Sequence, residues 1–191
     1  NLAWIDSWDG QAFKIFADGV LVYSQIHRYL SNPSSDNTCQ NSMFSDAYET
    51  ITFGFNHTSS SLIFVITSTL DEPSYNEAWG ICNFAVTVSA NPVTSSGSVI
   101  EVFNITQTTT TWFSCSNPIL HHKWSYSAAY STIDCSGNTY LGPYGKEATV
   151  TSPTLLLGSH KGIIVSFNMA WIDSWDGEVF KITADGTEVY S

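Results

Sequence analysis

The sequence predicts an all-β protein, an antiparallel β-sandwich of Ig-like or jelly-roll-like type, and three observations support this fold class. Short runs of β-branched and aromatic residues alternate with polar residues, as in strands with one buried face. Turn residues separate these runs, and no segment repeats its apolar residues at the 3.6-residue spacing of a helix. Aromatic residues make up 14% of the chain and charged residues only 12%, which favours extended pleated surfaces.

The first predicted element is a β-hairpin near the N-terminus. Residues 13–17 alternate apolar and polar side chains, Asp18-Gly19 supplies the turn, and residues 20–23 form the returning strand. A polar stretch at residues 31–46 follows, which we expect to be a loop held by its cysteine. Further strands are expected, in sequence order, at residues 49–55, 62–69, 79–89, 99–113 and 163–167.

The most informative feature is an internal repeat. Residues 1–24 and 168–191 are identical at 18 of 24 aligned positions, with an offset of 167 residues. This period is far longer than that of a solenoid repeat, so it predicts one whole domain per period. A strand-like run at residues 162–167 precedes the second copy, whereas the first copy begins at Asn1.

The repeat predicts two incomplete pieces of sandwich. We expect residues 1–90 to form a module that lacks its leading strand, residues 91–111 to form a linker or an extra strand, and residues 112–191 to form the N-terminal part of a second module. Such pieces arise from a covalent tandem array, or from a head-to-tail homopolymer in which each subunit completes the next by strand addition. In a homopolymer the expected contact residues are Ile163, Ile164, Val165 and Phe167.

Charge and hydropathy exclude several partners. Seventeen acidic residues against six Lys and Arg give a formal net charge of −11, which repels phosphate backbones and anionic lipid surfaces. No segment approaches the ~20 apolar residues of a membrane span. We therefore expect no nucleic-acid partner and no membrane span. Because the sequence starts at Asn1 without a signal peptide, we expect a mature or excised chain.

Cysteines and glycosylation motifs indicate an oxidising, secretory environment. Four cysteines without C-x-x-C spacing predict two disulfides rather than a metal cluster. Three pairings are possible, and we favour Cys39–Cys82 with Cys115–Cys135, because each bridge then stays within one expected module. Two Asn-x-Thr motifs predict N-linked glycans at Asn56 and Asn104. Together these features predict an extracellular or cell-surface protein.

An acidic turn in each repeat copy is a candidate calcium-binding site. In Asp6-Ser7-Trp8-Asp9-Gly10, two carboxylates three residues apart can share a hard cation through their oxygens. The alternative is an Asx-type turn, in which the carboxylates accept backbone hydrogen bonds. The spacing does not match an EF-hand loop, so both interpretations stay open. The candidate calcium ligands are Asp6 and Asp9, their counterparts Asp173 and Asp176, and Asp71 and Glu77 from the acidic stretch at residues 70–77.

The remaining motifs do not indicate catalysis. There is no G-x-S-x-G nucleophile elbow and no glycine-rich phosphate loop, and the cysteines are expected to be bridged. We therefore expect that the chain is not an enzyme. Most of the seven tryptophans are expected in the core, whereas Trp112 and Trp124 are expected to be exposed or at an interface because their sequence surroundings are polar.

The motifs resemble those of one group of secreted proteins. The segments Ile5-Asp6-Ser7-Trp8-Asp9-Gly10 and Glu77-Ala78-Trp79-Gly80-Ile81 are similar to the DSWDGE turn and the E-x-W-G-I segment that bracket one β-sandwich in tandem-repeat surface proteins of ciliate-type protists. They also resemble the subunit type of extracellular glycosylated fibrils from fresh water. The resemblance covers residues 1–89 and, more weakly, 140–191, and it implies architecture more than activity. Gln11 and Ala78 depart from the commoner Glu and Ser.

Two functions follow from these observations. We expect a structural subunit of an extracellular filament, fibril or surface coat, assembled head to tail with copies of itself by strand complementation. Exposed Asn, Ser and Thr would carry N-linked and O-linked glycans. The alternative is a calcium-dependent carbohydrate-binding adhesin that uses Asp6, Asp9 and the acidic stretch. An adhesin binds glycans as a monomer and releases them in chelator, whereas a polymer stays long with or without calcium.

Overall fold

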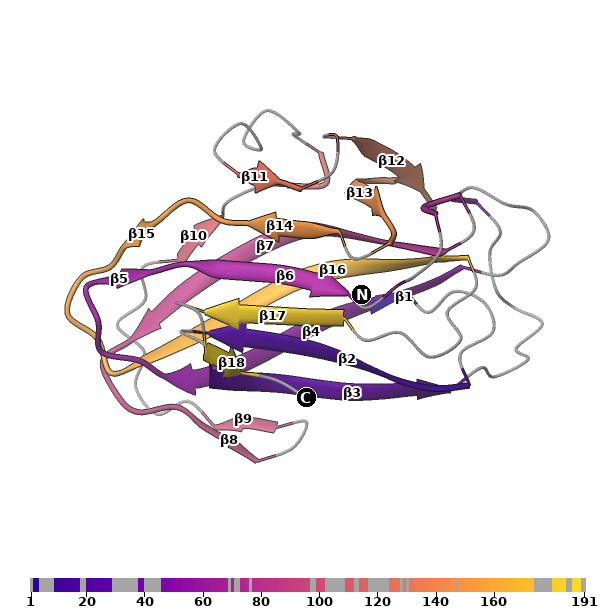
Figure 1. Ribbon diagram of the computed structural model, residues 1–191. Coiled ribbons are helices and arrows are strands. Elements are labelled where there is room, and N and C mark those ends of the chain that lie inside the picture. The colour runs from indigo at the N-terminus through magenta and orange to yellow at the C-terminus, as the bar shows by residue number, and fades with distance from the viewer. Residues whose placement is uncertain are drawn as a thin grey trace.

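The computed structural model contains two seven-stranded β-sheets that pack as two layers (Figure 1). Every element in the part of the chain that the structure describes is a β-strand, so the predicted all-β, antiparallel fold class is confirmed. The structure describes residues 2–3, 9–17, 20–28, 38–39, 46–68, 70, 73–75, 77–96, 99–101, 109–111, 114–116, 124–127, 129, 131–146, 148–173, 180–184 and 187–189. These residues include no helix long and apolar enough to cross a membrane.

The first sheet, sheet A, has the strand order β1-β4-β16-β7-β13-β12, and β10 also pairs with β7. Its strands are β1 (Leu2–Ala3), β4 (Ala47–Asn56), β7 (Glu77–Ser89), β10 (Thr109–Thr111), β12 (Thr132–Cys135), β13 (Asn138–Tyr144) and β16 (Gly162–Asp173). Strand β16 lies between β4 and β7 and is antiparallel to both (Figure 1).

The second sheet, sheet B, has the order β11-β14-β6-β17-β18-β3-β2. Its strands are β2 (Asp9–Ala17), β3 (Val20–Arg28), β6 (Phe64–Ser68), β11 (Ser125–Tyr126), β14 (Thr149–Thr151), β17 (Phe180–Ala184) and β18 (Thr187–Val189). Two short ribbons pair β5 (Ser61–Leu62) with β15 (Leu155–Leu156) and β8 (Thr94–Ser96) with β9 (Val99–Glu101). The predicted N-terminal hairpin is confirmed as β2–β3, and the strands expected at 49–55, 62–69 and 79–89 are confirmed as β4, β5 with β6, and β7.

The core lies between the sheets and is rich in aromatic rings. Along β4, Ile51, Phe53 and Phe55 are buried while the alternate residues Thr50 and Thr52 are exposed, as expected for a strand with one buried face. In the layer between the sheets, Phe64 meets Phe84 edge-on at 5.4 Å, and Phe84 meets Trp124 edge-on at 5.3 Å. The expectation that Trp124 is exposed was therefore wrong. Trp124 is 5% exposed, because its ring fills the core beside Phe84 despite its polar sequence neighbours.

The expected boundary at residues 91–111 does not divide the sheets. Strand β7, from the expected first module, pairs with β13 and β16, which come from residues 112–191. In sheet B, β6 likewise pairs with β14 and β17. The second repeat copy thus begins inside the pair of sheets and not at the edge of one. Strands from residues 1–90 and strands from residues 112–191 therefore lie together in both sheets.

Two disulfides form, but not with the expected partners. The bridges are Cys82–Cys115 and Cys39–Cys135, so the pairing Cys39–Cys82 with Cys115–Cys135 was wrong. The cause is the course of β10, whose last residue Thr111 pairs with Ala85 of β7 and so brings Cys115 to Cys82. The second bridge spans 96 residues and joins the two expected modules. Disulfides of this kind form and persist in oxidising compartments.

Gly142 occupies a position of close approach between β13 and β7. Its φ of +142° lies in a region that L-residues with a side chain rarely adopt. A Cβ at this position would lie 2.6 Å from the carbonyl oxygen of Trp79 and 3.1 Å from the Cα of Gly80. Glycine is therefore required here for β13 to pack against β7.

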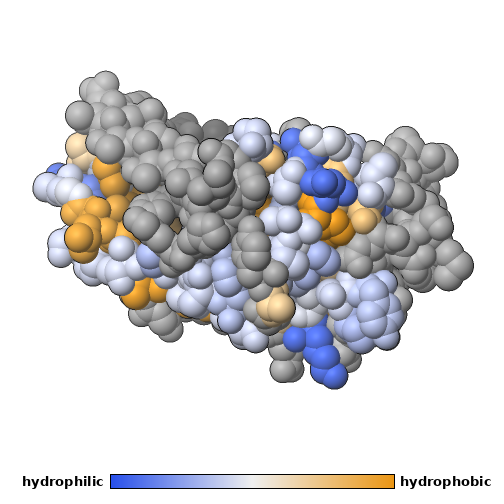
Figure 2. Space-filling model, turned by 90° about the horizontal axis from the view of Figure 1, so that it is seen from above, coloured by the Kyte–Doolittle hydropathy of each residue, from blue (hydrophilic) through white to orange (hydrophobic). Residues whose placement is uncertain are grey.

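The described surface is mostly hydrophilic. Tyr75 and Leu156 are the large hydrophobic residues that stay exposed in the described part of the chain, at 70% and 87%. Figure 2 shows hydrophobic surface at the left end of the molecule, the end where β5 and β15 lie in Figure 1. The remaining described hydrophobic side chains are largely taken up by the core.

Candidate functional site

The strongest candidate site is the position between β4 and β7 in sheet A that β16 occupies. Residues Gly162–Asp173 pair with Ser89–Glu77 of β7 through eleven residue pairs, and Phe167 pairs with Ile51 of β4. Strand β16 thus joins β1 and β4 on one side to β7, β13 and β12 on the other. Because β16 runs directly into the second repeat copy, which begins at Asn168, that copy supplies part of the strand that closes the sheet.

The side chains of β16 that face the core are large and fully buried. Ile163, Val165 and Phe167 are 0% exposed, while Ile164, between them, is partly buried on the other face. The ring of Phe167 stacks on Phe84 at 5.7 Å and meets Phe53 edge-on at 6.5 Å. Burying each such side chain stabilises a fold by roughly 1.5–3 kcal/mol. The four expected polymer-contact residues therefore lie in the central strand of their own chain's sheet A.

A β-bulge in β7 faces this strand. Ser166 pairs with Ala85 but Asn168 pairs with Cys82, so β7 carries one more residue than β16 over this stretch. Within the bulge, Asn83 has a φ of +55°, which Asn tolerates better than most residues. Its exposed side chain accepts a hydrogen bond from the backbone N–H of Cys115 at 3.1 Å. The bulge therefore positions the turn that carries the Cys82–Cys115 bridge.

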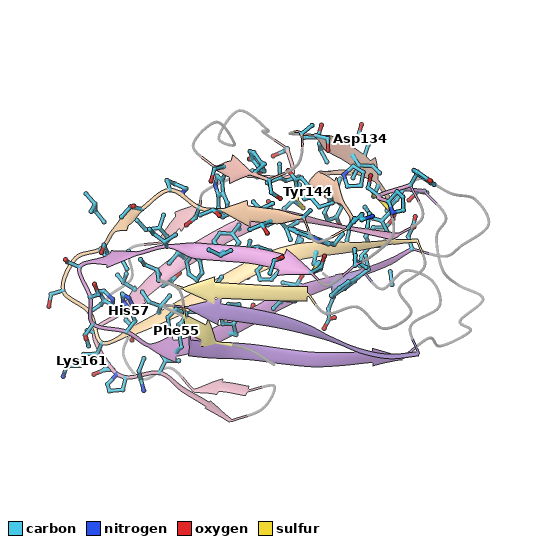
Figure 3. All side chains as sticks on the ribbon, viewed as in Figure 1. Phe55, His57, Asp134, Tyr144 and Lys161 are labelled. Carbon is cyan, nitrogen blue, oxygen red and sulfur yellow. A yellow bond between two sulfur atoms is a disulfide. The ribbon has the colours of Figure 1, made fainter. Side chains whose placement is uncertain are left out.

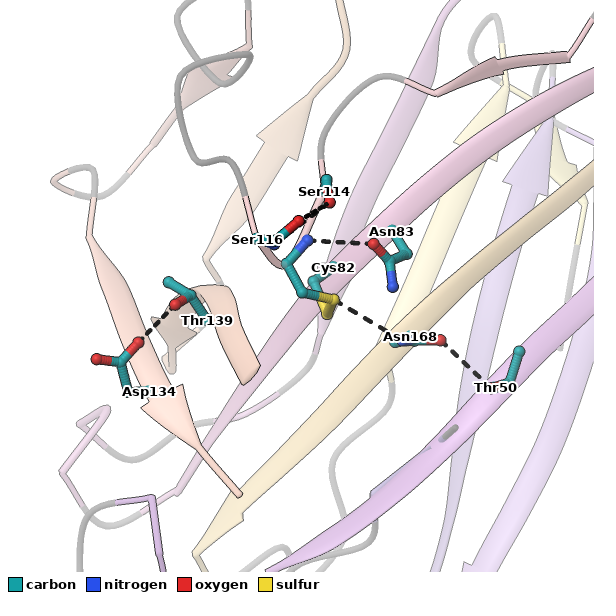
Figure 4. Close-up of a disulfide and its surroundings, with 9 residues drawn as sticks. Thr50, Cys82, Asn83, Ser114, Ser116, Asp134, Thr139 and Asn168 are labelled. Atoms are coloured by element: carbon teal, nitrogen blue, oxygen red, sulfur yellow. Dashed lines mark hydrogen bonds between the residues drawn. A yellow bond between two sulfur atoms is a disulfide. The ribbon is translucent and has the colours of Figure 1, made fainter. Parts of the chain in front are cut away.

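Polar contacts hold the outer face of β16 on both sides. The Asn168 amide donates to Sγ of Cys115 at 3.8 Å, and its oxygen accepts from the Thr50 hydroxyl at 3.3 Å (Figure 4). Two residues farther along each strand, the hydroxyls of Thr52 and Ser166 are 3.2 Å apart. These contacts connect β16 to β4 and to the disulfide. They add to the backbone ladder that fixes the strand.

A buried histidine pair lies where β4 ends and β16 begins. Nδ1 of His57 is 2.7 Å from Nε2 of His160, and the rings stack with centroids 5.0 Å apart. Nδ1 of His160 donates to the carbonyl oxygen of Gly158 at 2.6 Å, so its Nε2 is the acceptor for His57 Nδ1–H when both rings are neutral. Burial, together with the neighbouring His160, lowers the pKa of His57 from 6.5 to about 4. Figure 3 shows His57 near Phe55 and Lys161 at this end of the molecule.

Val93 closes the same end of sheet A. It is 3% exposed and lies over two glycines, Gly54 of β4 and Gly162 of β16, where any Cβ would clash with a Val93 methyl group. The backbone N–H of Val93 donates to Oδ1 of Asn56 at 2.8 Å. Gly162, the first residue of β16, therefore lacks the side chain that would clash with Val93, which follows β7 in the sequence. Its backbone also pairs with Ser89 of that strand.

The first glycosylation motif lies at this end as well. Asn56 and Thr58 are exposed, whereas His57 between them is buried in the histidine pair. The motif is therefore presented to solvent in the folded chain, as glycan attachment requires. The second motif, at Asn104, lies outside the described residues.

The candidate calcium ligands are only partly described. Asp6, Asp71 and Asp176 lie outside the described residues, while Asp9, Glu77 and Asp173 lie on β2, β7 and β16. The register places Asp173 opposite Glu77 on neighbouring strands. In the described part of the chain no three His, Cys, Asp or Glu residues gather where they could hold a metal ion.

Several of these features cannot be found in the sequence. His57 and His160 are 103 residues apart, and neither stands in a motif that would pair them. Val93 and its two glycines likewise meet only after β4, β7 and β16 are assembled. The signal that was available is the strand-like run at residues 162–167, which correctly indicated an apolar strand before the second repeat copy.

The fold and site define a disulfide-bonded β-sandwich domain that is closed by a strand continuous with a repeat copy. Comparison with known protein families matches residues 33–160 to the family described as bacterial virulence factor lipase N-terminal. The match covers two thirds of the 191 residues, and the chain belongs to this family. Residues 33–160, called the body below, contain all four cysteines but neither repeat copy nor β16. Neither the curated proteins nor the solved structures gave a match.

Proposed function

We propose that this chain is a structural subunit of an extracellular filament, fibril or surface coat. Subunits assemble head to tail, and the segment that begins with β16 completes the sandwich of a neighbour. Glycans at Asn56 and on exposed hydroxyl residues coat the outside. The sequence resemblance to tandem-repeat surface proteins and to glycosylated fibrils points the same way.

The observation that carries this proposal is the central position of β16. Without it, β4 and β7 have no partner on their facing edges, and the core residues Phe53 and Phe84 lose Phe167. Open strand edges next to exposed core residues bind further strands readily. A body that lacks its own β16 segment is therefore an acceptor for the same segment from another subunit.

The family match supports a division into body and closing segment. The match begins at residue 33 and ends at residue 160, two residues before β16 begins at Gly162. The body therefore matches a unit found in a protein family, while the segment from Asn168 onward belongs to the repeat. A body that is followed by a segment able to close a second body is suited to head-to-tail assembly.

The test is the size of the purified protein as a function of its concentration. The chain, secreted from a eukaryotic host so that disulfides and glycans form, is examined by sedimentation velocity from low to high micromolar concentration. A head-to-tail polymer gives a broad distribution that moves to larger species as concentration rises. A single species near 21.0 kDa plus glycan at every concentration would contradict the proposal.

A second candidate is a calcium-dependent carbohydrate-binding adhesin. The observation that favours it is the register that sets Glu77 opposite Asp173, because it places two acidic residues at neighbouring strand positions and calcium prefers carboxylate oxygens. A glycan-array experiment with calcium and with chelator distinguishes the two functions. Glycan binding by a monomer that disappears in chelator supports the adhesin.

We also propose that the chain itself is not catalytic. The family description names the N-terminal part of a lipase, and the sequence carries no G-x-S-x-G nucleophile elbow. Hydrolysis of short- and long-chain p-nitrophenyl esters is the direct assay. Turnover that survives repurification and is abolished by a serine-directed inhibitor would contradict this view.

A further inference from the structure

The two repeat copies pair with the same strand of the body in the same register. Ala17 of β2 and Ala184 of β17 both pair with Phe64 of β6. One residue along, Phe16 and Thr183 both pair with Val65. The paired residues of the two copies differ by 167, which is the offset of the repeat. Strand β6 therefore binds both copies in the same way.

In sheet A the two copies do not share an edge. Leu2 of β1 pairs with Glu49 of β4, and Phe167 of β16 pairs with Ile51 of the same strand. Strand β4 lies between β1 and β16, so the first copy and the strand that leads into the second copy occupy opposite edges of it. Competition between the two copies is therefore confined to sheet B.

At β6 the two copies compete for one edge. Val65 pairs with Thr151 of β14, with Thr183 of β17 and with Phe16 of β2. A strand has two edges, and β14 occupies one of them, so β17 and β2 share the other. Five residues of β17 pair with β6, but only two residues of β2 do. Only one copy can form the complete ladder.

The two hairpins also run in the same direction. The pairs β2–β17 and β3–β18 are parallel, whereas each hairpin is antiparallel within itself. Phe13 of β2 pairs with Phe180, its own counterpart in the second copy. Two copies of one hairpin therefore lie beside a single acceptor edge, in the orientation that lets either of them occupy it.

We propose that the edge of β6 is an exchange site for the β17–β18 hairpin of a second copy of this chain. This inference rests on the proposed filament function and assigns its contact. The β2–β3 hairpin holds the edge while the subunit's own β17–β18 hairpin leaves for the next subunit. The hairpin arriving from the preceding subunit then displaces β2 in the same register. Because the registers match, each backbone hydrogen bond that breaks is replaced by an equivalent one, and the edge stays covered.

The test is a disulfide between two chains that each carry one new cysteine. Chains with V65C are mixed with chains with T183C and mildly oxidised. All four native cysteines are bridged, so the new thiols react with each other. Facing residues of antiparallel strands have Cα atoms roughly 4.5–5.5 Å apart, within the reach of a disulfide. The control is T187C, since Thr187 of β18 pairs with Ala184 and not with β6.

We expect a V65C–T183C heterodimer on a non-reducing gel, at least about ten times as abundant as the heterodimer with T187C. A V65C/T183C double variant in one chain provides the comparison. If the double variant cross-links internally and the mixed chains do not, the hairpin stays in its own subunit and the exchange is refuted. If neither cross-links, the register on which the inference rests is wrong.

The same samples separate the exchange from the filament function. If electron micrographs of these samples show filaments while the gel shows no interchain cross-link, the exchange site alone is overturned. Dispersed particles without the cross-link overturn the filament function as well.

Discussion

Replacing Phe167 with alanine tests whether β16 closes the sandwich. The Phe167 side chain is 0% exposed, stacks on Phe84 at 5.7 Å and meets Phe53 edge-on at 6.5 Å. Truncating a buried phenylalanine costs about 3–5 kcal/mol. With two aromatic partners lost as well, we expect a decrease in the free energy of unfolding of about 4 kcal/mol. That is a large part of the 5–15 kcal/mol that is typical of a folded domain.

The assay is urea denaturation followed by tryptophan fluorescence, because Trp79 and Trp171 are fully buried. The matched control is S166A, one residue away on the opposite face, where the hydroxyl contacts Thr52 at 3.2 Å. Loss of this partly exposed contact costs less than about 1 kcal/mol. Equal losses for F167A and S166A would refute the assignment of β16 as the closing strand of the core.

If the same strand completes a neighbouring subunit, F167A also weakens assembly. A loss of about 4 kcal/mol at the contact corresponds to a roughly 1,000-fold higher concentration for polymer formation. Sedimentation of F167A and S166A over the same concentration series measures this shift. Filaments of F167A at the wild-type concentration would place the contact elsewhere.

Three further predictions concern single residues. Because the pKa of His57 falls from 6.5 in the unfolded chain to about 4 in the fold, its contribution to stability is complete above pH 6.5 and is lost as the pH drops towards 4. The loss is at most about 3 kcal/mol, and H57F should flatten this part of the curve of unfolding free energy against pH. Gly142→Ala should destabilise the fold by about 3 kcal/mol or more, measured by urea denaturation, since its Cβ would meet the carbonyl oxygen of Trp79; an unchanged midpoint would show that β13 lies farther from β7. Asn56→Gln should remove one glycan from the intact mass and lower the free energy of unfolding by about 1 kcal/mol, because Oδ1 of Asn56 accepts a hydrogen bond from the backbone N–H of Val93; an unchanged mass would show that the motif is unused.

The strands were predictable because each carries a local signal. In β4, the alternation of Thr50, Ile51, Thr52 and Phe53 in the sequence is the alternation of exposed and buried side chains in the structure. The Asp-Gly turn after Ala17 likewise indicated the β2–β3 hairpin. Such signals depend only on residues that are neighbours in the sequence, so they predict a strand without knowledge of the rest of the fold.

Pairing between distant segments was not predictable in the same way. The choice of Cys115 as partner for Cys82 depends on β10 running along β7, and the partner of Cys39 lies 96 residues away. The assumption that each bridge stays within one expected module gave the wrong pairing. The contact between His57 and His160 has the same origin, because it exists only where β4 and β16 are neighbours.

The place of the repeat in the fold could not be predicted from its period. Its period predicted one domain per 167 residues, with the boundary near residues 91–111. The sheets instead draw strands from both sides of that boundary, and the second copy pairs with β7 and β6 of the body. A repeat in sequence fixes a period, whereas the point at which one sandwich ends depends on which strand fills the gap between β4 and β7.

Electron microscopy of the native glycosylated material, with and without calcium chelator, followed by intact-mass measurement after denaturation, tests the central claim most directly. We expect long filaments in both conditions that dissociate into chains of 21.0 kDa plus glycan. Dispersed particles in both conditions would contradict head-to-tail assembly. Filaments that release only one very long polypeptide would show a covalent array in its place.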